Sequence, residues 1–391
     1  MNISSVEREK ISPSNTVSTT IVGKSINEVV LNAYRQALIS PKKDSRNGST
    51  RSIQNLNLII TDPSQRWLSL EGRKSNPFAM LAETLWVLSG SDKIRPYLEF
   101  YLPRAADFSD DNATWRGAYA PRIFSKDALQ GAVEILEKDL LSRRAVLTIY
   151  DNNLDSPLAL QEQGLNSSRD IPCNNWIHFY VTEEIEQVVD SVTQEQKEVA
   201  LQKLNMKVVS RSGDLIWGLG SINIFEWTFL QEIVWEILKR THPDLLLGIY
   251  YHSTTDAHIY ESNDGTGLNT ASQARTVVEN YNNTPILDLD TIPMNTGFVS
   301  INHMRNFCSD IVGATSSFIV GEIDSLGYEE FVSHKLKDIR GTFFATMIQS
   351  LMIHTICKKD DSKVTVTIDP ELAFWKSIEM FAGKKFSVMY K

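Results

Sequence analysis

The spacing of apolar residues predicts strands alternating with helices through about residue 260. The expected helices span residues 26–38, 77–88, 128–141 and 224–238, and the expected strands span residues 56–60, 145–150, 174–181, 206–210 and 245–251. The helix at 77–88 begins at Asn76-Pro77 and ends at Gly90. It is apolar on almost every face, so we expect it to be buried. This order of elements is typical of an α/β (α+β) protein.

The remaining segments lack this alternation. Residues 1–24 are rich in Ser, Thr and Asn, which predicts a flexible N-terminal segment. Residues 183–197 are highly charged and predict a solvated helical or loop insertion. The chain turns polar and loop-like at residues 265–294, and helices are then expected at 328–357 and 370–381. We therefore expect a catalytic domain at 25–284 and a mainly helical C-terminal extension at 285–391.

Composition narrows the class of protein. The chain of 391 residues carries a net charge of −9, which argues against general nucleic-acid binding. A nucleotide-sized anion needs only a few local arginines. Three widely separated cysteines favour a reducing, cytoplasmic setting over a disulfide framework. No apolar run approaches the roughly 20 residues of a membrane span. No spacing typical of metal ligands is visible, so no metal is expected.

Four blocks carry candidate chemistry. Pro172-Cys173 stands directly before an aromatic strand, Arg211-Ser212-Gly213-Asp214 follows, and Asn223 comes a dozen residues after Arg211. Asp256-Ala257-His258-Ile259-Tyr260 completes the set. A thiol, an arginine with an aspartate, an amide and a His-x-Tyr pair are suited to covalent catalysis on a small anionic ligand.

These blocks resemble, in the same order, the motifs of the thymidylate synthase and pyrimidine-nucleotide hydroxymethylase family. The resemblance covers roughly residues 25–265. It implies a mixed, twisted sheet backed by helices, with Cys173 as the nucleophile. It also implies a homodimer, because in the family a pair corresponding to Arg143 and Arg144 reaches the partner's nucleotide phosphate. Two adjacent arginines at a strand start are more often plain surface.

The resemblance implies roles for the other residues. Glu83, in Glu-Thr-Leu-Trp, would be the general acid/base, although a buried glutamate can also form a structural ion pair. Tyr119 would be the active-site tyrosine. The phosphate would be held by Arg46, Arg211 and Ser212 with the arginine pair, although Arg46 also fits a plain basic surface loop. The sugar would be held by His258 and Tyr260, and the folate by Asp214, Trp115 and Gly218. Asp214 would also be catalytic, managing protons through water together with Glu83.

The chemistry explains the need for a thiolate. C5 of a pyrimidine is a poor nucleophile, and addition of Cys173 to C6 turns the ring into an enolate whose C5 can attack a one-carbon unit. A nearby Arg211 would favour the thiolate. The Asn223 amide can donate to O4 and accept from N3–H, which is the pattern of uracil. The interval from Arg211 to Asn223 is one residue longer than usual in the family, so Glu226 could instead lie nearest the base.

The function expected from the sequence is transfer of a one-carbon unit from 5,10-methylenetetrahydrofolate to a pyrimidine nucleoside monophosphate. The first interpretation is dUMP to dTMP. The alternatives are 5-hydroxymethylation of dUMP, dCMP or CMP, and a catalytically idle nucleotide-binding relative. Asn174 replaces the histidine that usually follows the family's cysteine, and the chain lacks the usual C-terminal valine. Both departures concern closure of the site, which decides whether water or hydride reaches the methylene intermediate.

Overall fold

The computed structural model describes residues 18–45, 48–189, 196–261, 269–368, 371–381 and 386–390. Its strands are β1 Thr19–Gly23, β2 Lys42–Ser45, β3 Gly48–Ile60, β4 Val146–Thr148, β5 Asn174–Val189, β6 Gln196–Ser210, β7 Gly213–Asp214, β8 Leu246–Tyr260, β9 Val364–Ile368 and β10 Phe386–Tyr390. Its α-helices are α1 Ile26–Ile39, α2 Pro77–Leu88, α3 Glu99–Tyr101, α4 Tyr119–Ile123, α5 Ala128–Lys138, α6 Asn152–Asp155, α7 Pro157–Glu162, α8 Ile224–Leu238, α9 Thr270–Asn280, α10 Ile301–Val320, α11 Ser325–Lys335, α12 Phe343–Lys359 and α13 Ala373–Phe381.

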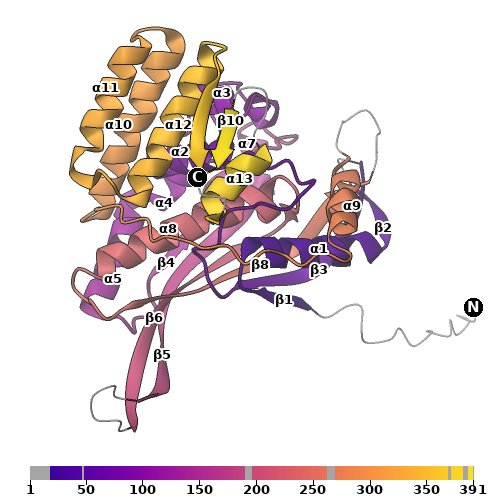
Figure 1. The fold of residues 1–391 in the computed structure, drawn as a ribbon. Coiled ribbons are helices and arrows are strands. Elements are labelled where there is room, and N and C mark those ends of the chain that lie inside the picture. Colours follow the sequence, from indigo (N-terminus) through magenta and orange to yellow (C-terminus); the bar gives the residue numbers. More distant parts are fainter. Residues whose placement is uncertain are drawn as a thin grey trace, which may run out of the picture.

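An eight-stranded mixed sheet forms the centre of the fold. Its main order is β1-β3-β8-β6-β5-β4, with β2 beside β3 and β7 beside β8. β1 and β6 run parallel to their neighbours β3 and β8, whereas β5 is antiparallel to β6. Helices α1 and α8 lie against the sheet (Figure 1). The predicted fold class, a mixed sheet backed by helices, is confirmed.

The helix α2 is buried as its sequence predicts. The Asn76 side chain caps it by accepting from the backbone N–H groups of Phe78 and Ala79. Every residue from Pro77 to Leu88 is buried. An unpaired carboxyl on this helix therefore has little access to water, which matters for Glu83 below.

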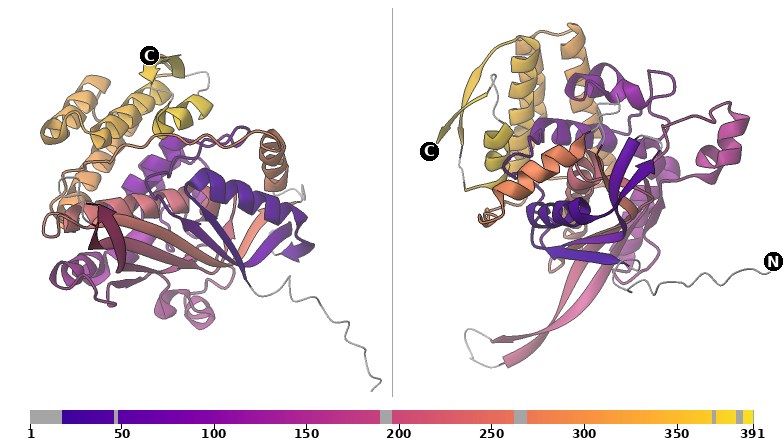
Figure 2. Two further views of the ribbon diagram at one scale, coloured as in Figure 1. Left: turned by 60° about the horizontal axis from the view of Figure 1, so that its bottom comes forward. Right: turned by 90° about the vertical axis from the view of Figure 1, so that its right-hand side faces the viewer.

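Two predictions for local structure are wrong. Residues 18–24 were expected to be flexible, but Thr19–Gly23 forms β1 at one end of the main strand order; residues 1–17 lie outside the described residues. Residues 183–197 were expected to form a helix or loop, but the described part extends β5 and β6 into a long hairpin (Figures 1 and 2). Cross-strand polar pairs, such as Lys203 with Glu184, stabilise this hairpin. Because these polar residues show no apolar periodicity, the sequence did not indicate the strands.

The C-terminal segment is mainly helical, as expected, but it packs on the catalytic part. The ring of His354 on α12 stacks on Phe78 of α2, with the centroids 4.1 Å apart. The Gln65 side chain donates to the carbonyl of Leu289. Helices α9 and α10 were not predicted, and the helix expected at 328–357 is broken between α11 and α12, where Gly341 has a φ of 86°. One hydrophobic core spans both parts.

Candidate active site

A cavity of about 300 Å³ collects residues that lie far apart in the sequence. Its walls come from α2, the segment that leads into α4, the loop before β5, β7 and the turn before α8. Seven of the predicted site residues line it: Glu83, Trp115, Tyr119, Cys173, Asp214, Gly218 and Asn223. The geometry thus places a thiol, two carboxyls, a phenol and an amide around one space.

Cys173 is partly exposed and lies immediately before β5. Its carbonyl accepts from the backbone N–H of Arg211 at 2.9 Å. The Arg211 guanidinium donates to the carbonyls of Ile171 and Pro172, each at 3.1 Å. Arg211 therefore holds the cysteine loop, a role that the sequence analysis did not foresee. Neither Arg211 nor Ser212 is among the residues that line the 300 Å³ cavity.

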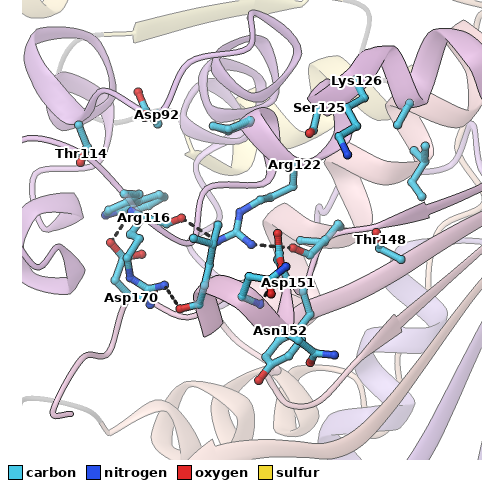
Figure 3. Close-up of a pocket in the computed structure, with 18 of the residues that line it drawn as sticks. Asp92, Thr114, Arg116, Arg122, Ser125, Lys126, Thr148, Asp151, Asn152 and Asp170 are labelled. Atoms are coloured by element: carbon cyan, nitrogen blue, oxygen red, sulfur yellow. Dashed lines mark hydrogen bonds between the residues drawn. The ribbon is translucent and has the colours of Figure 1, made fainter. Parts of the chain in front are cut away.

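A buried ion network fixes the same loop from its other side. The Asp170 carboxylate accepts from the backbone N–H groups of Arg116 and Gly117 at 2.6 and 2.8 Å (Figure 3). Arg116 and Arg122 both pair with Asp155, at 2.9 and 2.8 Å. These contacts border a second, larger cavity of about 1000 Å³ that does not include Cys173. Sequence motifs gave no sign of this network, because its members are distant charged residues.

Glu83 is only 8% exposed and has no ion-pair partner among the described residues. Burial raises its pKa to about 8. Burial, and then the nearby carboxyl of Glu83, raise the pKa of Glu226 well above its usual value. Burial also raises the pKa of Tyr119, with further increases from Cys173, Glu226 and Glu83. The described residues therefore give no support to a structural ion pair for Glu83, and burial favours the protonated form of its carboxyl.

Replacement of Glu83 by glutamine is expected to stabilise the protein more at pH 8 than at pH 5. The folded-state pKa of Glu83 is raised from 4.5 to about 8, so between these values the unfolded chain releases a proton that the folded chain keeps. The stability of the parent protein then falls as the pH rises, by up to about 1.4 kcal/mol per pH unit. Glu83→Gln removes this pH-dependent loss of stability, because glutamine does not titrate.

Urea unfolding of both proteins from pH 5 to pH 8 measures the difference. Glu162→Gln, which changes an exposed carboxyl on α7, is the control and should leave the pH dependence unchanged. If the difference in free energy of unfolding between Glu83→Gln and the parent stayed constant over this pH range, the raised pKa of Glu83 would be contradicted.

Asn223 reaches the cavity through a π-helical turn at Gly218–Asn223 that leads into α8. A π-helical turn accommodates one extra residue in a helix, which matches the one-residue-longer interval noted in the sequence. Gly220 is required there, since a Cβ would lie 1.9 Å from the carbonyl oxygen of Leu215. The Asn223 amide nitrogen donates to Glu226 Oε1 at 3.1 Å. Asn223, and not Glu226, is among the residues that line the cavity.

Asp214 joins the cavity to strand β8. One of its carboxylate oxygens accepts from the backbone N–H groups of Ile216 and Trp217, at 2.7 and 2.6 Å. Burial raises the pKa of Asp214. Its register partner on β8 is His258, whose ring contacts Tyr260 at a centroid distance of 5.1 Å. His258 and Tyr260 lie outside the cavity lining and were not brought into it by the fold.

His258 is held by acidic neighbours. Its Nδ1 lies 3.3 Å from Asp256 Oδ1. Burial alone would lower the pKa of His258, but the carboxylates of Asp256 and Asp214 outweigh burial and raise it. The charged form of the His258 imidazole, next to Asp214 in the strand pairing, is therefore favoured as the pH falls.

The predicted phosphate ligands do not converge inside one chain. Arg143 and Arg144 are exposed at the start of β4 and do not line the cavity. Arg46 lies outside the described residues. The cavity wall instead contains Arg169, an exposed residue that no motif singled out.

A third cavity, of about 440 Å³, adjoins the first and shares Glu83, Phe108, Trp115, Gly218 and Asn223 with it. Its own walls add apolar groups from Leu102 and Ile222, and the Arg104 guanidinium lies 5.8 Å from the ring centroid of Trp217. Phe108 and Trp217 are each more than 40% exposed at its rim. No motif in the sequence indicated this apolar shelf, although exposed aromatic residues beside a polar cavity are a signal of ligand binding.

Two kinds of feature are absent from the described part of the chain. No cluster of His, Cys, Asp or Glu there could hold a metal ion. No helix there is both long and apolar enough to cross a membrane.

The family model described as thymidylate synthase matches residues 40–304. A deoxyuridylate hydroxymethyltransferase of Delftia phage PhiW-14 is 38% identical over 304 residues, which cover 77% of this chain and 75% of that protein. The proteins of the same name from Pseudomonas phage M6 and Bacillus phage SP01 are 29% and 24% identical, over 58% and 69% of this chain and 57% and 67% of their own lengths. The crystal structure of thymidylate synthase from T4 phage is 17% identical with a TM-score of 0.48, covering 71% of this chain and 90% of that one.

The matched family model and the 38% identical relative define a one-carbon transferase enzyme. The chain belongs to the thymidylate synthase family.

Proposed function

We propose that this enzyme hydroxymethylates C5 of dUMP. The observation that carries the proposal is the 38% identity, over 77% of the chain, to a protein named deoxyuridylate hydroxymethyltransferase. Two further relatives have the same name. The sequence analysis placed dTMP formation first and hydroxymethylation second, and the relatives favour the reverse order.

The residues around the cavity can perform each step. The Cys173 thiolate adds to C6, and the ring enolate takes up the one-carbon unit at C5. Loss of the C5 proton, together with cleavage of the bond between the transferred carbon and the folate nitrogen, releases tetrahydrofolate and leaves an exocyclic methylene group. Water then adds its oxygen to that carbon, and the Cys173 thiolate leaves C6, so that the nucleotide gains one hydroxymethyl group for each water consumed. Glu83, whose pKa burial raises to about 8, is suited to accept and return the protons.

Polar side chains beside the cysteine support a role for water. Asn174, which follows Cys173, is only 1% exposed, and neither its amide nitrogen nor its oxygen has a partner among the described residues. The Glu226 Oε2 atom is also buried and without a partner there. Buried polar atoms of this kind are usually satisfied by ordered water. Water held near the nucleophile favours hydroxylation of the methylene carbon over hydride transfer to it.

In this proposal methylenetetrahydrofolate, the co-substrate of the family, would lie against the neighbouring apolar shelf. Phe108, Trp115 and Trp217 offer flat apolar surfaces for an aromatic ring system, and Arg104 offers a cation at the rim. Asp214 lines the cavity of Cys173, and its near neighbour along the chain, Gly218, lines both cavities. When bound, the folate supplies the one-carbon unit at the oxidation level of formaldehyde.

The phosphate site is completed by a second copy of the chain in this proposal. Arg143 and Arg144 are exposed and are not among the residues that line the cavity of their own chain, as expected of side chains that serve a partner. The sheet face carrying Trp176, His178 and Tyr180 is only partly buried in one chain, whereas Ile177 on the opposite face is fully buried. A homodimer would cover this aromatic face. Arg211, Ser212, His258 and Tyr260 would complete the binding of phosphate and sugar.

Competition among nucleotides tests the substrate. We expect dUMP to be consumed in preference to dCMP and CMP when all three are supplied with methylenetetrahydrofolate, because the Asn223 amide can satisfy both N3–H and O4 of uracil. Mass analysis of the nucleotides identifies the product. Preferential consumption of dCMP or CMP would overturn the substrate assignment.

A further inference from the structure

Glu226 is a buried carboxyl that the steps above do not use. It lies in the first turn of α8 and is 2% exposed. Its Oε1 accepts from the Asn223 amide nitrogen at 3.1 Å, while its Oε2 has no partner in the described part of the chain. Burying a carboxyl is costly, so its contact with a cavity residue calls for a function.

The contact sets the orientation of the Asn223 amide. The nitrogen faces Glu226, and the oxygen faces Gly218, where a Cβ would lie 3.3 Å from it. Gly218 and Asn223 both line the cavity. An amide nitrogen carries two hydrogens, so one remains available after the bond to Glu226.

We propose that Glu226 is a positioning residue that determines base specificity by fixing the Asn223 amide in the orientation that recognises uracil. The inference rests on the proposed function, since it concerns how the same site selects its nucleotide. In this orientation the Asn223 oxygen accepts from N3–H of uracil and the second N–H donates to O4. Cytosine has an acceptor at N3 and an amino group at C4, so it requires the amide to be turned over.

Glu226 opposes the turned-over amide when its carboxyl is ionised. An ionised carboxylate can only accept hydrogen bonds. The turned-over amide would then bring its oxygen against Oε1, and two acceptors would face each other. A protonated carboxyl can donate as well as accept, so the selection is exerted by the ionised form. Recognition of cytosine would therefore lose a hydrogen bond inside the protein.

Glu226→Gln tests this proposal with little change in volume. The glutamine amide can present either its oxygen or its nitrogen to Asn223, so both orientations of Asn223 become acceptable. We expect the ratio of kcat/KM for dUMP to that for dCMP to fall about tenfold or more. The preference in binding affinity for dUMP over dCMP, measured by titration with each nucleotide, should decrease in parallel.

Glu236→Gln is the matched control. Glu236 is also a carboxyl on α8, but it accepts from the backbone N–H groups of Asn295 and Thr296 at 2.7 and 2.8 Å, far from the cavity lining. Its replacement should leave the nucleotide ratio unchanged. A purely structural role of Glu226 would lower turnover of both nucleotides equally and leave their ratio at the parent value, which would overturn the proposal.

A second variant keeps the test decisive. Glu226→Asp keeps the carboxyl but withdraws it by one methylene, so the bond to Asn223 is lost and the ratio should also fall. If Glu226→Gln does not fold, this variant decides the question, and an unchanged ratio refutes the inference. Failure of the parent enzyme to act on dUMP would instead refute the proposed function, while the titrations would still show whether Glu226 controls nucleotide preference.

Discussion

Replacement of Cys173 by serine is expected to abolish hydroxymethyl transfer while leaving dUMP bound. A serine hydroxyl is far less nucleophilic than a thiolate, so the covalent step at C6 is lost. The expected decrease in kcat is on the order of a thousandfold or more, which corresponds to about 4 kcal/mol of activation free energy. Steady-state turnover and equilibrium binding of dUMP measure the two effects separately.

Cys357→Ala is the control for this variant. Cys357 is buried on α12 and does not line the cavity, so its loss should change stability and leave kcat near the parent value. Near-normal turnover by Cys173→Ser would show that Cys173 is not the nucleophile.

Mixing two inactive variants is expected to restore activity. In the proposed dimer, Arg143 and Arg144 serve the partner's site and Cys173 serves its own. Cys173→Ser chains combined with Arg143→Ala/Arg144→Ala chains then form hybrids in which one site has every group intact. With free exchange of subunits in a two-fold dimer, we expect about a quarter of the parent activity. Activity assays over a range of mixing ratios measure the recovery.

The control mixes Cys173→Ser chains with Glu83→Gln chains. Both replaced residues line the cavity of their own chain, so no hybrid site is complete and no recovery is expected. Exchange is verified by mass analysis of differently tagged subunits. If exchange occurs and the arginine variant recovers no activity, the arginines do not act across an interface.

Local sequence was sufficient where the chemistry is encoded in neighbouring residues. In the largely apolar run of α2 Glu83 is the only charged residue, and Pro172-Cys173 ahead of an aromatic strand marks the proposed nucleophile. The fold then brings both to one cavity, which was expected only from the family resemblance.

The remaining features depend on contacts between distant residues. Asp170 belongs to no motif, yet its carboxylate holds the backbone of Arg116 beside the cysteine loop. The hairpin of β5 and β6 has charged side chains without periodicity, so only backbone pairing with the other strand reveals it. The extra residue before Asn223 made its position ambiguous in the sequence, and the π-helical turn resolves it.

The origin of the oxygen in the product tests the proposed function most directly. The reaction is run with dUMP and methylenetetrahydrofolate in water enriched in the heavy isotope of oxygen, and the nucleotide product is analysed by mass spectrometry. The account predicts a 5-hydroxymethyl nucleotide whose new hydroxyl carries the solvent label, because water adds to the methylene carbon beside Glu83 and Asn174. An unlabelled 5-methyl nucleotide would show that hydride, not water, reaches this carbon, and would contradict the account.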